Sequence, residues 1–352
     1  MDTYGESMIR IVSVGTPPRP FRVIFDTGHE QAVNGRNSST FWLPVVGCHN
    51  FRSWGQFCRN RTSLYDRRAS STAKKTHEFF YVRYGEGAVV GFVYEDLVAV
   101  SFLTENPRSI LSSLKFGAPN ERQLKLRRPV RFGGGFLTLD GDQGILGLSF
   151  RRPKERTNSL FEEAVRQRVL DRPLFSVFLR KCPPGRKECA GAGEIVLGGE
   201  DRRHCGRMAD WIPLVNGTTD WEFEVDSLRI GHSFTAKNVR AISDTGSSHL
   251  FLPKRELKRV VRSLGAKKRG DGFVVPCTSA PEVRLSVRGR EYVIPPAQIG
   301  DRIDKAGKKC LLYLGSNGNE QQWILGDSWI RSYCQVHDWG NRRIGFAPVI
   351  AQ

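Results

Sequence analysis

Apolar and polar residues alternate in short runs along the chain, and glycine and proline separate these runs. Alternation of this kind covers residues 22–25, 79–84, 89–100 and 175–179. A period of two places successive side chains on opposite faces of a strand, so that one face is buried and the other is solvated. The pattern therefore predicts a fold built mainly from β-strands.

Helical spacing of apolar residues occurs in two segments. The first covers residues 159–169, where Ser159 and Glu162 form a candidate capping box. The second begins near Pro253 and ends at Gly265, with apolar residues at intervals of three and four. We predict helices in these two segments and few elsewhere.

The tripeptide Asp-Thr-Gly occurs twice, each time after an apolar run, at residues 26–28 and 244–246. Each copy is followed further along the chain by a second similar motif, Gly-Ile-Leu-Gly-Leu at 144–148 and Trp-Ile-Leu-Gly-Asp at 323–327. Repetition in the same order indicates a duplicated unit that has diverged.

The length of 352 residues suits two such units. We place the boundary near residues 172–176, after the first predicted helix. An N-terminal lobe of residues 1–174 then carries the first aspartate, and a C-terminal lobe of residues 175–352 carries the second.

An aspartate at the end of an apolar strand is costly to bury, and a single copy is usually a surface turn in which the carboxylate caps backbone groups. The duplication favours a catalytic pair instead. If the lobes meet about a pseudo-twofold axis, Asp26 and Asp244 share one proton, because two close carboxylates do not both ionise cheaply. The ionised member takes a proton from water while the protonated member donates to a peptide carbonyl. Supporting hydroxyls and close backbone N–H groups come from Thr27, Gly28, Thr245 and Gly246.

Further motifs stand in order around these tripeptides, and with them the chain resembles the pepsin-like aspartic proteases nearly end to end. They are Gly15-Thr16-Pro17, Phe41-Trp42-Leu43-Pro44, Tyr84-Gly85-Glu86-Gly87, Gly144-Ile145-Leu146-Gly147-Leu148, Asp244-Thr245-Gly246-Ser247-Ser248, Ile324-Leu325-Gly326-Asp327 and Ile344-Gly345-Phe346-Ala347.

Within this family, the chain most resembles secreted or lysosomal invertebrate members. The resemblance implies an all-β, bilobal pepsin-like fold of two pseudo-twofold-related β-barrel-like lobes with few short helices. It also implies an endopeptidase that acts on polypeptide substrates at acidic pH without metal or cofactor. Two motifs in one chain complete a site in a monomer.

By the same resemblance, Tyr84 is the tyrosine of a β-hairpin flap that closes over substrate, and Gly85 and Glu86 form its tip. Trp42 then lies close enough to hydrogen-bond the tyrosine hydroxyl, although simple core packing is the alternative interpretation of these aromatic residues. Glu86 departs from the family, which commonly has a small hydroxyl residue there. Ser247 is expected near bound substrate.

Residues 29–37 are the main departure from the family. They separate the first Asp-Thr-Gly from the Ser-Ser-Thr-Phe-Trp run at 38–42, and removing them restores the family pattern. Either the segment bulges harmlessly into solvent, or it displaces a hydroxyl near Asp26 and leaves an impaired homologue that binds peptides. A translated intron is a third explanation. His29 is interpreted as a solvated loop residue.

The eight cysteines include no C-x-x-C pair, which favours disulfides and an oxidising compartment over a zinc site. Asn37, Asn60 and Asn216 lie in glycosylation sequons. The N-terminus lacks the pattern of a secretory signal, so we expect a mature form or an incomplete gene model without signal peptide or propeptide. Connectivity is open from sequence alone, but the resemblance implies Cys48–Cys58, Cys182–Cys189, Cys205–Cys334 and Cys277–Cys310.

The formal charge is +18, with basic runs at 127–131, 151–156 and 254–269. None of these runs interleaves aromatic residues as a base-stacking platform does, so we expect no nucleic-acid partner. Solubility and substrate steering explain the charge more simply, while binding of an anionic polymer predicts a steep salt dependence. No stretch is long and apolar enough to span a bilayer.

Overall fold

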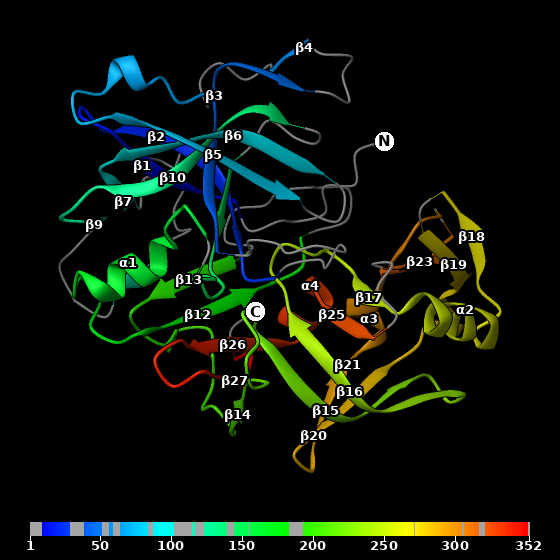
Figure 1. Ribbon diagram of the computed structural model, residues 1–352. Coiled ribbons are helices and arrows are strands. Elements are labelled where there is room, and N and C mark those ends of the chain that lie inside the picture. Colours follow the sequence, from blue (N-terminus) through cyan, green and yellow to red (C-terminus); the bar gives the residue numbers. More distant parts are fainter. Residues whose placement is uncertain are drawn as a thin grey trace. The chain divides into compact units, whose positions relative to one another are not determined.

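The protein is seen in a computed structural model (Figure 1), in which strands predominate and helices are few and short. This confirms the predicted all-β fold class. The structure describes residues 9–28, 39–50, 56–58, 64–83, 87–101, 115–116, 123–138, 144–153, 155–182, 193–270, 272–304, 306–316 and 321–350.

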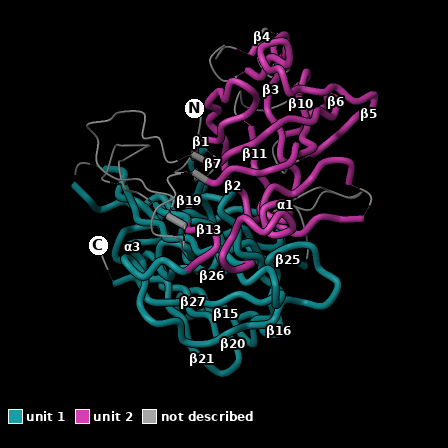
Figure 2. The backbone as a smooth tube through the Cα atoms, turned by 90° about the vertical axis from the view of Figure 1, so that its left-hand side faces the viewer, with its two compact units in different colours: residues 1–6, 174–195, 200–352 teal, residues 7–173, 196–199 magenta. Residues whose placement is uncertain are grey.

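The chain divides into two compact units, coloured separately in Figure 2. The N-terminal unit comprises residues 7–173 and 196–199, and the C-terminal unit contains residues 174–195 and 200–352. Residues 196–199 join the N-terminal unit, where β13 (Gly193–Leu197) pairs in parallel with β8 (Lys115–Phe116). The lobes predicted at 1–174 and 175–352 stay a prediction.

The N-terminal unit is organised around one large sheet in the order β5-β6-β10-β3-β11-β2-β1-β7-β9, with β4 on β3. Among the described residues of this unit, α1 (Leu160–Arg166) is the α-helix. The strands are β1 (Ile9–Val14), β2 (Arg19–Asp26), β3 (Phe41–Asn50), β4 (Gln56–Phe57), β5 (Lys74–Arg83), β6 (Ala88–Asp96), β7 (Val98–Ser101), β9 (Gln123–Lys125), β10 (Val130–Thr138) and β11 (Gly144–Gly147), with a 3-10 turn at Arg67–Ala69.

The C-terminal unit holds a seven-stranded sheet in the order β21-β20-β15-β16-β25-β17-β24 and a four-stranded sheet in the order β18-β19-β23-β22. A further set pairs β14 with β27, β27 with β26 and β26 with β12. The strands are β12 (Leu174–Leu179), β14 (Trp211–Pro213), β15 (Glu222–Ile230), β16 (Phe234–Ser243), β17 (Leu250–Leu252), β18 (Lys267–Arg269), β19 (Gly272–Pro276), β20 (Val283–Val287), β21 (Arg290–Ile294), β22 (Gly300–Arg302), β23 (Lys309–Leu312), β24 (Leu314–Ser316), β25 (Gln322–Leu325), β26 (Tyr333–Asp338) and β27 (Arg343–Pro348). The helices are α2 (Lys254–Ser263), α3 (Pro296–Ile299) and α4 (Asp327–Ile330), with a 3-10 turn at Cys277–Ser279.

Both predicted helices are confirmed, the first with a correction. The Ser159 hydroxyl accepts from the Glu162 N–H at 3.4 Å, as a cap requires, but α1 ends at Arg166 and not at residue 169. The chain leaves the helix because Arg168 adopts a left-handed conformation with φ of 53°. The second helix follows Pro253 and stops before Gly265, whose φ is +59°.

The run at 89–100, predicted as one strand, is two strands, β6 and β7. The buried Asp96 carboxylate causes the break because it accepts from the backbone N–H of Leu97 at 2.8 Å and from the Thr72 hydroxyl at 2.6 Å. Tyr65 donates to its second oxygen at 2.8 Å. The chain therefore turns at Leu97, and β7 joins β1 instead of β10.

Three disulfides join described cysteines: Cys48–Cys58, Cys205–Cys334 and Cys277–Cys310. These confirm three of the four predicted pairs. Cys189 lies outside the described residues, so its pairing with Cys182 stays a prediction. Over the part of the chain that the structure describes, no helix is long and apolar enough to cross a membrane.

A histidine is enclosed in the apolar core of the C-terminal unit. His337 is fully buried, its ring stacks on Phe175 at 4.5 Å, and it meets Trp221 edge to face at 4.7 Å. Neither ring nitrogen has a hydrogen-bond partner among the described residues. Burial lowers the pKa of His337 to about 3, because the charged imidazolium has no compensation there.

This burial predicts an acid-sensitive fold. Between pH 6.5 and about 3 the unfolded chain binds a proton at His337 that the folded chain does not, so stability falls as pH falls, by about 1.4 kcal/mol per pH unit. We expect His337→Phe, which preserves the stack, to reduce the fall in stability between pH 6.5 and 4.5 by about 2–3 kcal/mol, measured by denaturant unfolding. The same change at exposed His232 is the control. Identical pH dependence in wild type and His337→Phe would contradict the assignment.

Candidate active site

Asp26 stands at the carboxyl end of β2, in the interior of the N-terminal sheet. It pairs in parallel register with Gly147 of β11, and its carbonyl accepts from the Leu148 N–H at 2.7 Å. The side chain is 8 % exposed, and its Oδ1 accepts from the Gly28 N–H at 2.9 Å. The turn therefore points a backbone donor at the carboxylate and fixes its direction.

The end of β11 clamps the loop that contains Asp26. The Ser149 hydroxyl donates to the carbonyl of the buried Thr27 at 2.6 Å, and Gly147 N–H donates to the Thr40 carbonyl at 3.1 Å. One short segment thus holds the chain before and after residues 29–38, which lie outside the described part. The predicted insertion at 29–37 is among them, so its conformation stays open.

The chain is also anchored directly after that segment. Ser39 and Thr40 are buried; Ser39 donates its hydroxyl to Glu155, and Thr40 accepts from the Thr157 hydroxyl at 3.2 Å. Burial raises the pKa of the Glu155 carboxyl, and the Ser39 hydrogen bond opposes this shift. Sequence reasoning missed Glu155 and Thr157, which carry no motif. Ser149 directly follows the Gly-Ile-Leu-Gly-Leu motif, so the position of that motif could have indicated its role.

Asp244 occupies the matching place in the C-terminal unit, directly after β16. Its N–H donates to the Leu325 carbonyl of β25 at 3.0 Å. Both carboxylate oxygens have donors: Oδ1 accepts from the Gly246 N–H at 2.7 Å and Oδ2 from the Ser247 hydroxyl at 2.6 Å. With 3 % of its surface exposed, Asp244 is held more tightly than a solvated turn residue.

The motif Trp-Ile-Leu-Gly-Asp at 323–327 requires a glycine at position 326. A Cβ at this position would lie 2.1 Å from the Ser247 carbonyl oxygen and 2.5 Å from that of His249. The backbone directly after β25 therefore approaches the Asp244 loop more closely than a residue with a Cβ allows. Asp327 N–H continues the contact by donating to the Ser247 carbonyl at 2.8 Å.

The two local arrangements share one chemical design. In each unit an aspartate ends a strand that has a parallel neighbour, and its Oδ1 accepts from the N–H of the glycine two residues further on. Such carboxylates are fixed in direction and can take up or release a proton with little reorganisation. This repetition makes the aspartate of each Asp-Thr-Gly loop a candidate catalytic residue.

Comparison with known proteins identifies the family. Residues 8–349 match the sequence profile described as eukaryotic aspartyl protease. The chain belongs to the eukaryotic aspartyl protease family. The predicted resemblance to pepsin-like aspartic proteases is therefore confirmed over nearly the whole length.

Individual members of the family are similar to this chain at moderate identity. Cathepsin E of Aquarana catesbeiana is 29% identical over 350 residues, which cover 96% of this chain and 78% of that protein. Cathepsin D of Mus musculus is 29% identical, with 99% and 80% covered. Pepsin A of Gallus gallus is 28% identical, with 96% and 83% covered.

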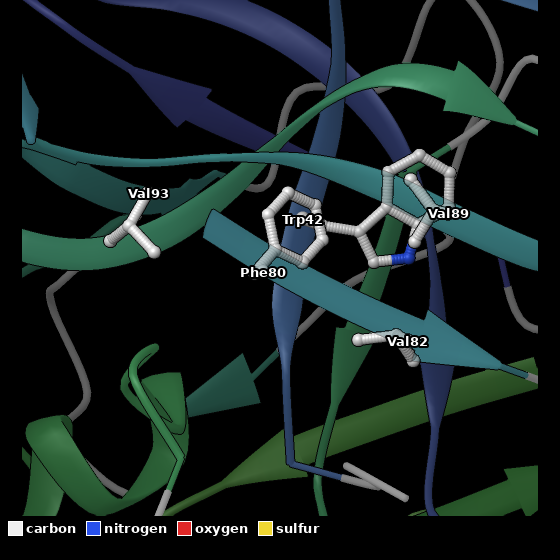
Figure 3. Packing of buried hydrophobic residues seen from close by; sticks show 5 residues of the cluster. All are labelled: Trp42, Phe80, Val82, Val89 and Val93. Carbon is white, nitrogen blue, oxygen red and sulfur yellow. The ribbon is translucent and has the colours of Figure 1, made fainter. Parts of the chain in front are cut away.

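The residues predicted to form the flap lie between β5 and β6, which pair in antiparallel fashion. Arg83 pairs with Ala88 at the end of this strand pair, and Trp42 packs beneath it in a cluster with Phe80, Val82, Val89 and Val93 (Figure 3). Trp42 is thus a core residue of the hairpin base. Tyr84, Gly85 and Glu86 lie outside the described residues, so their flap roles and the Trp42–Tyr84 hydrogen bond stay predictions.

Among the described residues, one group has the side chains that metals prefer. Potential ligand atoms of Glu194, Asp201 and His204 lie within 4.8 Å of one another. His204 Nδ1 already lies 2.7 Å from an Asp201 oxygen, and its ring stacks on Phe178 at 4.5 Å. These contacts make the group a fixed internal network next to the Cys205–Cys334 disulfide.

Two of the three predicted glycosylation sequons, at Asn37 and Asn60, lie outside the described residues. Asn216 is exposed in a turn between β14 and β15. Its position is accessible to a modifying enzyme, and its glycosylation stays a prediction.

Proposed function

We propose that the protein is an endopeptidase in which Asp26 and Asp244 form one water-activating pair. The observation that carries the proposal is the repeated loop design, in which each aspartate is buried at a strand end and oriented by a glycine N–H. Membership of the aspartyl protease family supports the same assignment.

In the proposed reaction the pair holds one proton and one water molecule. The ionised carboxylate takes a proton from the water, which attacks the peptide carbonyl carbon, while the protonated carboxyl donates to the carbonyl oxygen. The carboxyl that took the proton from water then donates it to the amide nitrogen, and the C–N bond breaks. One hydroxyl of the tetrahedral intermediate returns its proton to the other carboxylate as the C=O bond of the new carboxyl group forms. Thr27 and Thr245 support the loops, and the glycine N–H groups keep the carboxylates aimed.

The proposed substrate is an extended polypeptide bound under the β5–β6 hairpin, with Tyr84, Gly85, Glu86 and Ser247 near it. We propose that the enzyme acts as a monomer, since one chain supplies both aspartates. The described disulfides support a secreted or lysosomal route, because disulfides persist in oxidising compartments.

The direct experiment is cleavage of an unstructured protein substrate between pH 3 and 7, with products located by mass spectrometry. Cleavage that declines toward neutral pH supports the proposal, because one member of the pair must remain protonated. Binding of a statine-type inhibitor without any cleavage favours the second candidate, an impaired homologue that binds peptides. Residues 29–37, which separate Asp26 from the following hydroxyl run, motivate that candidate.

Ser247 offers a sharper test of the second loop. Ser247→Ala removes a donor from Asp244, and we expect kcat/KM for peptide cleavage to fall by about 10- to 100-fold, since hydrogen bonds to charged groups are worth about 1.5–3 kcal/mol. The acid limb of the pH profile is expected to move to higher pH, because the ionised form loses stabilisation. Ser247→Thr retains a hydroxyl and is the matched control. An unchanged pH profile in Ser247→Ala would show that Ser247 has no role in the site.

A further inference from the structure

A dense group of cations covers one segment of the C-terminal unit. Residues 254–269 contain eight basic residues and one acidic residue, which leaves a net seven positive charges against +18 for the whole chain. All eight basic side chains are exposed. We call this group the basic surface; it consists of Lys254, Arg255, Lys258, Arg259, Arg262, Lys267, Lys268 and Arg269.

The helix arranges five of these cations in adjoining rows. Lys254, Lys258 and Arg262 follow one another at intervals of four residues along α2, so they share a face, with a rise of about 6 Å between neighbours. Arg255 and Arg259 form a second row beside them. The three cations of β18 follow α2 closely in the sequence, after residues 264–266 (Figure 1).

Over the part of the chain that the structure describes, almost none of this charge is neutralised by an acidic side chain. Among the described residues, the only acidic contact to the basic surface is that of Arg259 with Glu256, at 2.7 Å. Arg259 also lies over the Phe234 ring at 5.2 Å. The other seven cations face solvent, where their mutual repulsion is relieved by an external anion.

The remaining faces of the helix restrict what the partner can be. Leu257 and Val260 are buried in the unit, so α2 has no free apolar face to insert into a bilayer. Residues 254–269 contain no aromatic side chain on which a nucleic-acid base could stack. The basic surface therefore recognises a partner by its negative charge alone. This mode of recognition suits a flexible polyanion.

We propose that the basic surface binds a sulfated polysaccharide. Such a chain carries closely spaced fixed negative charges, and both lysine and arginine bind sulfate by charge and hydrogen bonding. The disulfides indicate an oxidising compartment, where sulfated glycans are the accessible polyanions. The surface uses none of the catalytic residues, so it tethers the protein independently of peptide cleavage.

The test is binding of the full chain to size-defined heparin oligosaccharides, measured by calorimetry at several salt concentrations. We expect the variant Lys254→Gln/Lys258→Gln/Arg262→Gln to bind about a hundredfold more weakly, because each cation near an anionic surface contributes roughly a factor of five. The slope of log affinity against log salt is expected to become shallower. The matched control replaces Lys125, Arg127 and Arg128, three exposed cations of the N-terminal unit, and is expected to bind as wild type does.

Three results would overturn the proposal. The first is equal affinity of wild type and the α2 variant, with equal thermal unfolding midpoints showing that both are folded. The second is undiminished binding to a chemically desulfated oligosaccharide. The third is binding of single-stranded DNA, or of vesicles with anionic lipid, ten times tighter than heparin of the same charge. Peptide cleavage by the α2 variant is expected to equal that of wild type, so loss of polysaccharide binding is distinguishable from failure of the active site.

Discussion

Replacing either Asp26 or Asp244 by asparagine is expected to lower kcat/KM for peptide cleavage by about 1,000- to 10,000-fold. Asparagine fits the same space and can still accept from the glycine N–H groups, but it neither takes up nor supplies a proton. Because the two aspartates act as one unit, the double variant is expected to lose hardly more than either single variant. The measurement is steady-state cleavage of a quenched fluorescent peptide across pH 3 to 7.

The chain supplies a matched control for this experiment. Asp96 is a fully buried aspartate of the N-terminal unit, and its carboxylate accepts hydrogen bonds from hydroxyl groups at 2.6 and 2.8 Å. Its role is to stabilise the turn between β6 and β7. Asp96→Asn is expected to unfold at a lower temperature and to cleave normally well below that temperature. Undiminished cleavage in Asp26→Asn or Asp244→Asn would show that the pair does not perform the reaction.

Removing the Cys205–Cys334 disulfide is expected to cost about 5 kcal/mol of stability, by the loop-entropy relation for closing a long loop. The sequence separation is 129, so the bond strongly restricts the unfolded chain. The variant Cys205→Ala/Cys334→Ala is therefore expected to lower the unfolding temperature by roughly 10–20 °C, measured by calorimetry.

The other disulfides provide the comparison. Cys48–Cys58 spans a separation of 10, and its removal is expected to cost about 3 kcal/mol. Cys277–Cys310, with a separation of 33, is expected to lie between these values. If the Cys205–Cys334 variant is destabilised no more than the Cys48–Cys58 variant, native packing outweighs chain entropy as the source of stabilisation.

Several features of the fold were predictable because they depend on neighbours along the chain. Alternation identifies strands such as β2 directly, and Pro253 and Gly265 limit α2 through their own backbone preferences. The position of the two aspartates at strand ends follows from the apolar runs before them. The break at Leu97 was missed because its cause, the side chains of Tyr65 and Thr72 around Asp96, lies more than 20 residues away in sequence.

The candidate site likewise has residues that the local sequence indicates and residues that it does not. Sequence alone indicates Asp26, Asp244 and their glycines, because the motif carries both the carboxylate and the turn that orients it. It does not indicate that Glu155 receives the Ser39 hydroxyl, since these residues are 116 positions apart and no local pattern links them.

The sequence by itself determined the family, the strand-rich architecture, the duplicated Asp-Thr-Gly loops and the concentration of charge in residues 254–269. Only the tertiary structure decided which distant groups brace those loops, that His337 is enclosed between Phe175 and Trp221, and that α2 buries its apolar face and leaves its cations in solvent. The reason is physical: periodicity and turn chemistry are local, whereas burial and hydrogen-bond partners depend on which strands become neighbours.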